Sequence, residues 1–138
     1  MRGISLLLLG ATLASCMTGP PPPPTRNAMA EQQLQQLLAG KVARPEISCL
    51  QSYNTNDMTV IDGRTLAFRR GTGTVYLAHL SPGCELLSPQ STYALLSRQF
   101  GNTGTCRGDI QQVIDTTNRI TVGSCTIESL IPYVRAGA

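Results

Sequence analysis

Four cysteines in the body of this 138-residue chain restrict its fold more than any other feature of the sequence: Cys49, Cys84, Cys106 and Cys125. An even number of cysteines in a small exported protein is typical of a disulfide framework. They are 35, 22 and 19 residues apart and form no Cys-x-x-Cys motif, so the spacing expected of a zinc site or a thioredoxin-like redox centre is missing. The sequence therefore predicts two structural disulfides, and we expect no metal and no cofactor.

Four cysteines allow three pairings, and the spacing alone does not choose among them. We expect Cys49 to pair with Cys125, because that bridge would tie the two ends of the body together. Cys84 would then pair with Cys106 inside the body. Each native bridge in a small secreted domain is worth about 2–5 kcal/mol of stability, so losing either one should impair folding.

The first sixteen residues have the pattern of an export signal. Arg2 supplies a positive charge, an apolar stretch follows from Ile4 to Ala14, and small residues close it. The stretch is too short to span a membrane, which takes about 20 residues as a helix. Its ending, Leu-Ala-Ser-Cys, resembles the bacterial lipobox, which implies cleavage before Cys16, a diacylglycerol thioether on the cysteine and acylation of the new N-terminus. The alternative is an ordinary signal peptide with an incidental cysteine.

Lipidation of Cys16 would make the membrane itself a partner of the mature protein. Two or three acyl chains hold a protein at a bilayer almost permanently, without spanning it. Met17 follows the cysteine where an inner-membrane retention signal would often place Asp, so we expect the periplasmic face of the outer membrane. Cleavage removes one of the 11 basic residues and none of the 8 acidic ones, leaving a net charge of about +2.

The rest of the chain divides into a tether, a short helix and a β domain. Five consecutive prolines, Pro20 to Pro24, favour an extended polyproline II rod of about 3 Å per residue. Strong helix formers follow from Ala28 to Ala39, with Leu34, Leu37 and Leu38 at helical spacing and Gly40 as a stop. We expect Met29 to extend this stripe as core filler. The expected units are a lipoprotein signal peptide (1–15), the lipidated Cys and Pro-rich tether (16–28), a short helix (29–40) and a disulfide-stabilised β domain (46–134).

Apolar and β-branched runs between turn residues predict strands from Asp57 onward. The predicted strands are Asp57–Ile61, Arg64–Arg69, Thr74–Leu80, Ile110–Asp115 and Arg119–Gly123. Asp62-Gly63 is the expected turn between the first two, with Leu66 and Phe68 on one face of the second strand. Residues 92–96 suit a strand or a helix, and we favour a strand. The last apolar piece, 127–134, contains Pro132, which suits an edge or terminal strand.

These elements predict a mainly β fold with one short N-terminal helix. Five or six short strands with short connections favour a small antiparallel curled sheet or partly open barrel, because closure removes exposed edges. A hydrophobic content of 41% in a chain of this length is enough for the core of one domain.

The order of several motifs is similar to that of a known family. The match covers about residues 48–133 and rests on Cys49-Leu50, Val60-x-Asp62-x-x-Thr65-Leu66-x-Phe68, Val75-Tyr76-x-x-x-Leu80 before Cys84, Cys106-x-Gly108-Asp109 and Cys125-x-Ile127-x-x-Leu130-x-Pro132. In this order the chain resembles a family of small exported bacterial proteins, many of them lipoproteins, whose function is uncharacterised. The resemblance implies the same fold and the same cellular location, and it implies no catalytic residues.

No motif in the sequence assigns a catalytic residue. His79 is the only histidine and falls in a predicted strand, where a triad would need a nucleophile and an orienting carboxylate beside it. Asp62 and Asp109 each stand beside a glycine, where aspartates usually bind turn backbone. The basic residues are scattered, with Arg69-Arg70 the only adjacent pair, so we expect no nucleic-acid partner.

Two classes of function therefore remain open. We favour an outer-membrane-anchored periplasmic lipoprotein that acts as a non-enzymatic binding or envelope-structural module, with a protein partner in the envelope. The alternative is a small periplasmic enzyme or thiol-redox protein that uses His79 or a reactive thiol.

Overall fold

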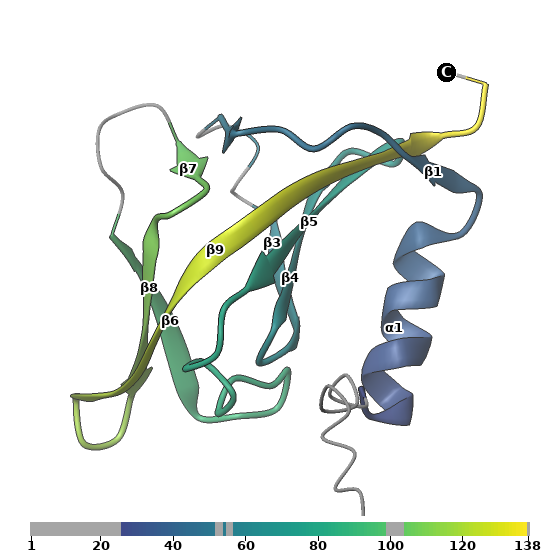
Figure 1. Ribbon diagram of the computed structural model, residues 1–138. Coiled ribbons are helices and arrows are strands. Elements are labelled where there is room, and N and C mark those ends of the chain that lie inside the picture. The colour runs from purple at the N-terminus through teal and green to yellow at the C-terminus, as the bar shows by residue number, and fades with distance from the viewer. Residues whose placement is uncertain (1–25, 52–53, 55–56, 99–103, 138) are drawn as a thin grey trace, which may run out of the picture.

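A computed structural model describes residues 26–51, 54, 57–98 and 104–137, and it shows one helix and nine strands in those residues (Figure 1). They are α1 (Ala28–Leu38), β1 (Lys41–Ala43), β2 (Cys49–Leu50), β3 (Met58–Asp62), β4 (Thr65–Arg70), β5 (Thr74–Leu80), β6 (Tyr93–Arg98), β7 (Thr105–Cys106), β8 (Ile110–Asp115) and β9 (Ile120–Arg135). The predicted signal peptide, Cys16 and the proline run lie outside the described residues. Within them, no helix has the length and apolar content to cross a membrane.

The strands form one curled antiparallel sheet, which confirms the predicted fold class. The order is β3-β4-β5-β9-β8-β6, and β1 pairs with the end of β9. Figure 1 shows the sheet bending into a half-barrel, with β3, β4 and β5 on one side and β6 and β8 on the other. The short strands β2 and β7 pair separately with each other. Residues 93–98 are a strand, as we favoured over a helix.

The prediction for the C-terminal part was wrong in one respect, because residues 120–135 form a single 16-residue strand at the centre of the sheet. Pro132 therefore lies in the last strand of the chain, as one alternative predicted, but that strand is central and not at an edge. Its carbonyl accepts a hydrogen bond from the Arg44 amide at 2.8 Å. Since the nitrogen and carbonyl of one strand residue face the same neighbour, the Pro132 nitrogen also points away from β5. The missing N–H thus removes no bond from the β5–β9 ladder.

The sheet carries a separate hydrophobic cluster on each face. Leu66 and Phe68 of β4 point into the hollow of the half-barrel with Leu80, Val113 and Leu130. The opposite face of the same strands is covered by α1, and Ala67, Val75 and Leu77 pack there. Burial on both faces explains why four successive residues of β4, 65–68, are all buried. The predicted faces of this strand are confirmed.

Helix α1 starts and stops for identifiable reasons. The Asn27 side chain caps it by accepting a hydrogen bond from the Ala30 amide at 2.7 Å, and Gly40 adopts a φ of 69° just beyond its end. Leu34 is buried against the sheet, with Leu37 and Leu38 partly buried beside it. Met29 was expected in this stripe, but it is 68% exposed. Its side chain lines an open cavity beside the helix instead of the core.

The predicted disulfide pairing was wrong, although two disulfides form as predicted. Cys49 pairs with Cys106, and Cys84 pairs with Cys125. Cys49 and Cys106 stand directly opposite each other in the β2–β7 pair, so their bridge closes that ribbon. Cys125 lies in β9, which runs through the middle of the sheet, and it meets Cys84 in the loop below β5. The C-terminal strand is therefore already held at the centre of the sheet by its neighbouring strands, and the domain does not need a disulfide to tie its two ends together.

Candidate functional site

One groove runs along α1 at the end of the domain where the described chain begins. It consists of two adjoining cavities, of about 460 and 680 Å³, that share Asn27, Ile61 and Ser88. We call the first the amide arm; it is lined by Asn27, Met29, Ala30, Gln32, Gln33, Gln36, Ile61, Ser88, Pro89 and Gln90. We call the second the charged arm; it is lined by Arg26, Asn27, Ile61, Asp62, Gly63, Arg64, Thr65, His79, Leu80, Glu85, Leu87, Ser88 and Glu128.

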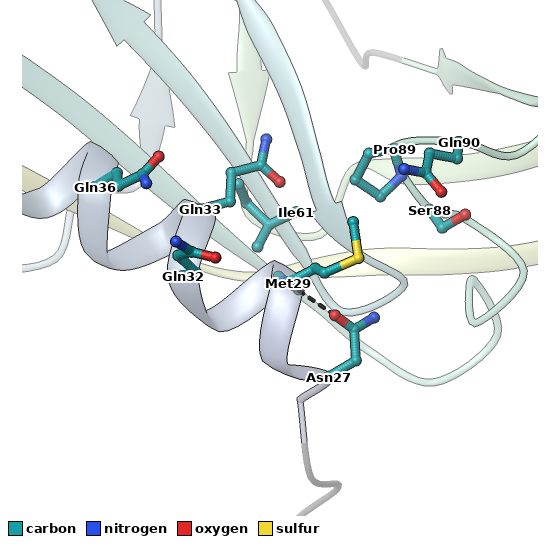
Figure 2. Close-up of a pocket in the computed structure, with 10 residues that line it drawn as sticks. Asn27, Met29, Gln32, Gln33, Gln36, Ile61, Ser88, Pro89 and Gln90 are labelled. Atoms are coloured by element: carbon teal, nitrogen blue, oxygen red, sulfur yellow. Dashed lines mark hydrogen bonds between the residues drawn. The ribbon is translucent and has the colours of Figure 1, made fainter.

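The amide arm lies between α1 and the loop that leads from β5 to β6. Figure 2 shows the glutamines of α1 on one side and Ser88, Pro89 and Gln90 on the other, with Ile61 behind them. Met29 reaches across the opening from the first turn of the helix. The arm therefore has an apolar floor and a rim of uncharged amides, and none of its lining residues is ionisable.

The walls of the groove are held by close backbone packing. A Cβ on Gly63, in the β3–β4 turn, would lie 2.5 Å from the Glu85 Cα, so only glycine permits this approach. The turn itself is tied by Asp62, whose carboxylate accepts the Arg64 amide at 2.8 Å. The neighbouring Cys84 is bonded to Cys125 of the central strand. The loop after β5 is therefore fixed to the sheet, which gives the groove a preformed wall.

Arg26 joins the beginning of the domain to the charged arm. Its Nε donates to the Asp62 carboxylate at 2.5 Å, its Nη1 to Glu31 at 3.3 Å and its Nη2 to the Thr65 hydroxyl at 2.9 Å. These contacts link the entry of the chain to both α1 and the β3–β4 hairpin. The guanidinium is only a quarter exposed, so its charge is largely satisfied within the protein.

His79 lies half-buried in the charged arm, on β5 opposite Thr65. Burial lowers the pKa of its imidazole below the ordinary value of 6.5, and the positive charges of Arg26 and Arg64 lower it further, against the opposing effect of Asp62 and Glu128. The ring is therefore neutral at pH 7. Within the described residues it forms no hydrogen bond, so one nitrogen can donate and the other can accept towards a ligand.

The lowered pKa of His79 predicts a pH-dependent stability. The unfolded chain takes up the proton at a higher pH than the folded chain does, so the free energy of unfolding should fall as the pH drops below 6.5, until the lower pKa of the folded state is passed. Urea unfolding between pH 7.5 and pH 5 should show this slope, and His79→Gln should flatten it. His79 is the only histidine, so its NMR titration gives the folded pKa directly. A slope that persists in His79→Gln would assign the effect to another group.

Two carboxylates, Glu85 and Glu128, stand at the rim of the charged arm beside Arg64. Glu128 is about half exposed and lies 3.9 Å from the Arg64 guanidinium. Glu85 accepts the Gly83 amide at 2.9 Å through both oxygens, and this hydrogen bond lowers the pKa of its carboxyl, with Arg64 contributing further. Arg64 also donates from its Nε to the Leu80 carbonyl at 2.6 Å, which fixes the guanidinium beside β5.

No catalytic arrangement forms around His79 in the described part of the chain. The nearest hydroxyl in register is that of Thr65, and it is engaged by Arg26. A triad needs the imidazole to be hydrogen-bonded to both a nucleophile and a carboxylate, and neither contact is present among these residues. The same residues hold no cluster of three or more His, Cys, Asp or Glu side chains placed to bind a metal ion.

The structure brings together only part of what the sequence singled out. Asp62 and His79 meet in the charged arm, while Asp109 lies elsewhere, buried, with its carboxylate accepting the Cys106 amide at 2.7 Å. Both aspartates thus bind turn backbone, as predicted. The groove itself was missed. Its lining residues include Arg26, Ser88 and Glu128, which are far apart in the sequence and carry no motif.

Comparison with models of known protein families, with curated proteins and with solved structures finds no match. The resemblance drawn from the order of the cysteine motifs therefore remains a prediction, and the function has to be argued from the groove and the sequence.

Proposed function

We propose that this protein is an outer-membrane-anchored lipoprotein of the periplasmic face that acts as a non-enzymatic binding module, with the groove as its binding site for an envelope partner. The observation that carries the proposal is a preformed, partly apolar groove that contains no catalytic arrangement in the described residues. Clefts with an apolar floor and a few convergent polar groups are the usual form of a binding site. The four body cysteines are paired in disulfides, which favours binding over thiol chemistry.

The groove also lies close to the proposed lipid anchor. Cys16 and Arg26 are ten residues apart, and an extended chain covers at most about 3.6 Å per residue, so the anchor lies within about 36 Å of Arg26. Arg26 lines the charged arm. A lipidated Cys16 would therefore keep the groove near the membrane surface, where it can meet partners that are themselves bound to the envelope.

The anchor is tested by replacing the lipidated residue. Cys16→Ser should move the protein from the membrane fraction to the soluble fraction, because the thioether and its acyl chains cannot form. Intact mass of the wild-type protein from membranes should show cleavage before Cys16 and a lipid increment. A wild-type protein of unmodified mass in the soluble fraction would overturn the anchor.

The binding role is tested by photo-crosslinking from inside and outside the groove. A photoreactive amino acid in place of Met29 lies in the amide arm, whereas one in place of Met58 lies on β3 outside the residues that line the groove. Both side chains are exposed, so they form a matched pair. We expect a discrete adduct in cells from position 29 alone. The same adducts from both positions, or none from position 29, would contradict a partner in the groove.

A further inference from the structure

We propose that the groove binds an extended peptide segment that carries a basic side chain, with its main chain along the amide arm and its cationic group in the charged arm. This inference rests on the proposed binding function and specifies its ligand. It is argued from the charges of one arm and the uncharged polar groups of the other.

Among the described residues that line the charged arm, the negative charges exceed the positive ones by one. Arg26 is matched by Asp62, which it contacts at 2.5 Å, and is drawn towards Glu31 as well. The remaining ionised groups are Arg64, Glu85 and Glu128, so one guanidinium faces two carboxylates.

Nearby arginines do not remove this excess. Arg107 donates to the backbone carbonyl of Glu128, but its guanidinium pairs with Glu46 at 3.2 Å. A cationic group in the charged arm would complete the balance. Both carboxylates are exposed, so their attraction for such a group is screened by salt.

His79 favours a cation for a second reason. Because its pKa is lowered, the ring is neutral at pH 7 and does not repel a positive group. Its acceptor nitrogen is available in the same arm, since the ring has no hydrogen-bond partner within the described residues. The ring and the two carboxylates come from three different segments, β5, the loop after it and β9, and they line one cavity.

The amide arm has the groups that a peptide backbone requires. Gln32, Gln33, Gln36 and Gln90 line it, and each amide can donate and accept, as the backbone N–H and C=O of an extended peptide do. Met29 and Pro89, which are both exposed, provide apolar surface for the side chains of the peptide. No Phe, Tyr or Trp, the side chains on which sugars usually stack, is among the residues that line either arm.

The test measures retention of peptide libraries by the mature protein in detergent micelles. Three libraries of acetylated, amidated hexapeptides would be compared, identical except for one fixed position that is Lys, norleucine or Glu. We expect the Lys library to be retained at least about tenfold better than either other library, and this preference to weaken at 0.5 M salt.

Variants of the protein then test whether the preference for the Lys library arises in the groove. Glu85→Gln with Glu128→Gln should reduce retention of the Lys library about tenfold, while glutamine keeps the acceptor for the Gly83 amide. Glu46→Gln is the matched control, because Glu46 pairs with Arg107 and does not line the groove. Ser88→Lys, at an exposed residue shared by both arms, should have the same effect by adding a positive charge, and it covers the case in which the double variant fails to fold.

Three results would overturn the inference: equal retention of the Lys and norleucine libraries, a preference unchanged by the groove variants, or binding of a chitin hexasaccharide with no peptide binding. A specific adduct from position 29 together with any of these would leave the binding function standing and remove only the peptide ligand. Absence of both the adduct and the preference would remove the two proposals together.

Discussion

Replacing Cys84 and Cys125 together by alanine should lower the free energy of unfolding by about 5 kcal/mol, and replacing Cys49 and Cys106 by about 4 kcal/mol. The bridges close loops of similar length, 41 and 57 residues, so loop entropy alone gives each about 4 kcal/mol. The two expected losses of stability differ because the two bridges are buried to different extents. Cys84 is 0% exposed and Cys125 is 4% exposed in the inner core, whereas Cys49 is exposed. Removing the buried pair adds a cavity of about 1 kcal/mol or more.

Chemical denaturation of the two double variants beside the wild type measures the difference, and peptide mapping of the wild type checks the pairing. A domain with a total stability of about 5–15 kcal/mol can be left largely unfolded by the first loss. A larger effect at Cys49 and Cys106 than at Cys84 and Cys125 would contradict the assigned roles. The exposed bridge should also be the first to react when a reductant is titrated into the folded protein, as alkylation and mass measurement would show.

The error in the pairing shows what the cysteine spacing leaves out. The loops of the three arrangements run from 19 to 76 residues, but the entropy of closing a loop changes only by about 0.6 kcal/mol per doubling of length, so the spacing does not distinguish nested from crossed bridges. The choice depends on where β9 lies, and that is a matter of topology. A long strand that pairs with β5 on one side and with β8 and β1 on the other brings Cys125 to the centre.

Local features of the fold were easier to predict. The hairpin of β3 and β4, strand β5 and strand β8 follow from alternation and turn residues, and the helix follows from leucine spacing and its flanking residues. The observed turn lies one residue later than predicted. The register shifts between Val60 and Asp62, so Asp62 ends β3 opposite Thr65 and leaves Gly63 and Arg64 as the loop. Its carboxylate binds the Arg64 amide, so the aspartate acts as predicted from a slightly different position.

The groove could not be predicted, because nothing in the sequence marks its members as neighbours. Glutamines on a helix and acidic residues in loops are ordinary surface residues when each is taken alone. They become a site only because α1 packs on the outer face of the sheet beside the β3–β4 turn and the loop after β5. Met29 is an example. Its spacing from the leucines of the helix suits a core position, but in the structure it is exposed and lines the amide arm.

Gly83→Ala is expected to cost about 3 kcal/mol of stability, because Gly83 stands where two backbones touch. It has a φ of 118°, which is strained for any residue with a side chain, and its Cβ would lie 2.0 Å from the Ser124 carbonyl oxygen. On the other backbone, a Cβ on Gly123 would lie 2.4 Å from the Gly83 oxygen, so neither chain has room to move towards the other. Alanine at position 83 must push the loop away from β9 beside the Cys84–Cys125 bridge.

Gly73→Ala provides the matched control, because a Cβ there meets nothing within 4 Å and Gly73 is not among the residues with a positive φ. Urea unfolding with both disulfides intact should show the loss at position 83 and little change at position 73. The displaced loop carries Glu85, and the Gly83 amide is its hydrogen-bond donor, so Gly83→Ala should also weaken retention of the Lys peptides. A stable Gly83→Ala protein with unchanged unfolding would show that the loop is not fixed against β9, and the preformed wall of the groove would have to be abandoned.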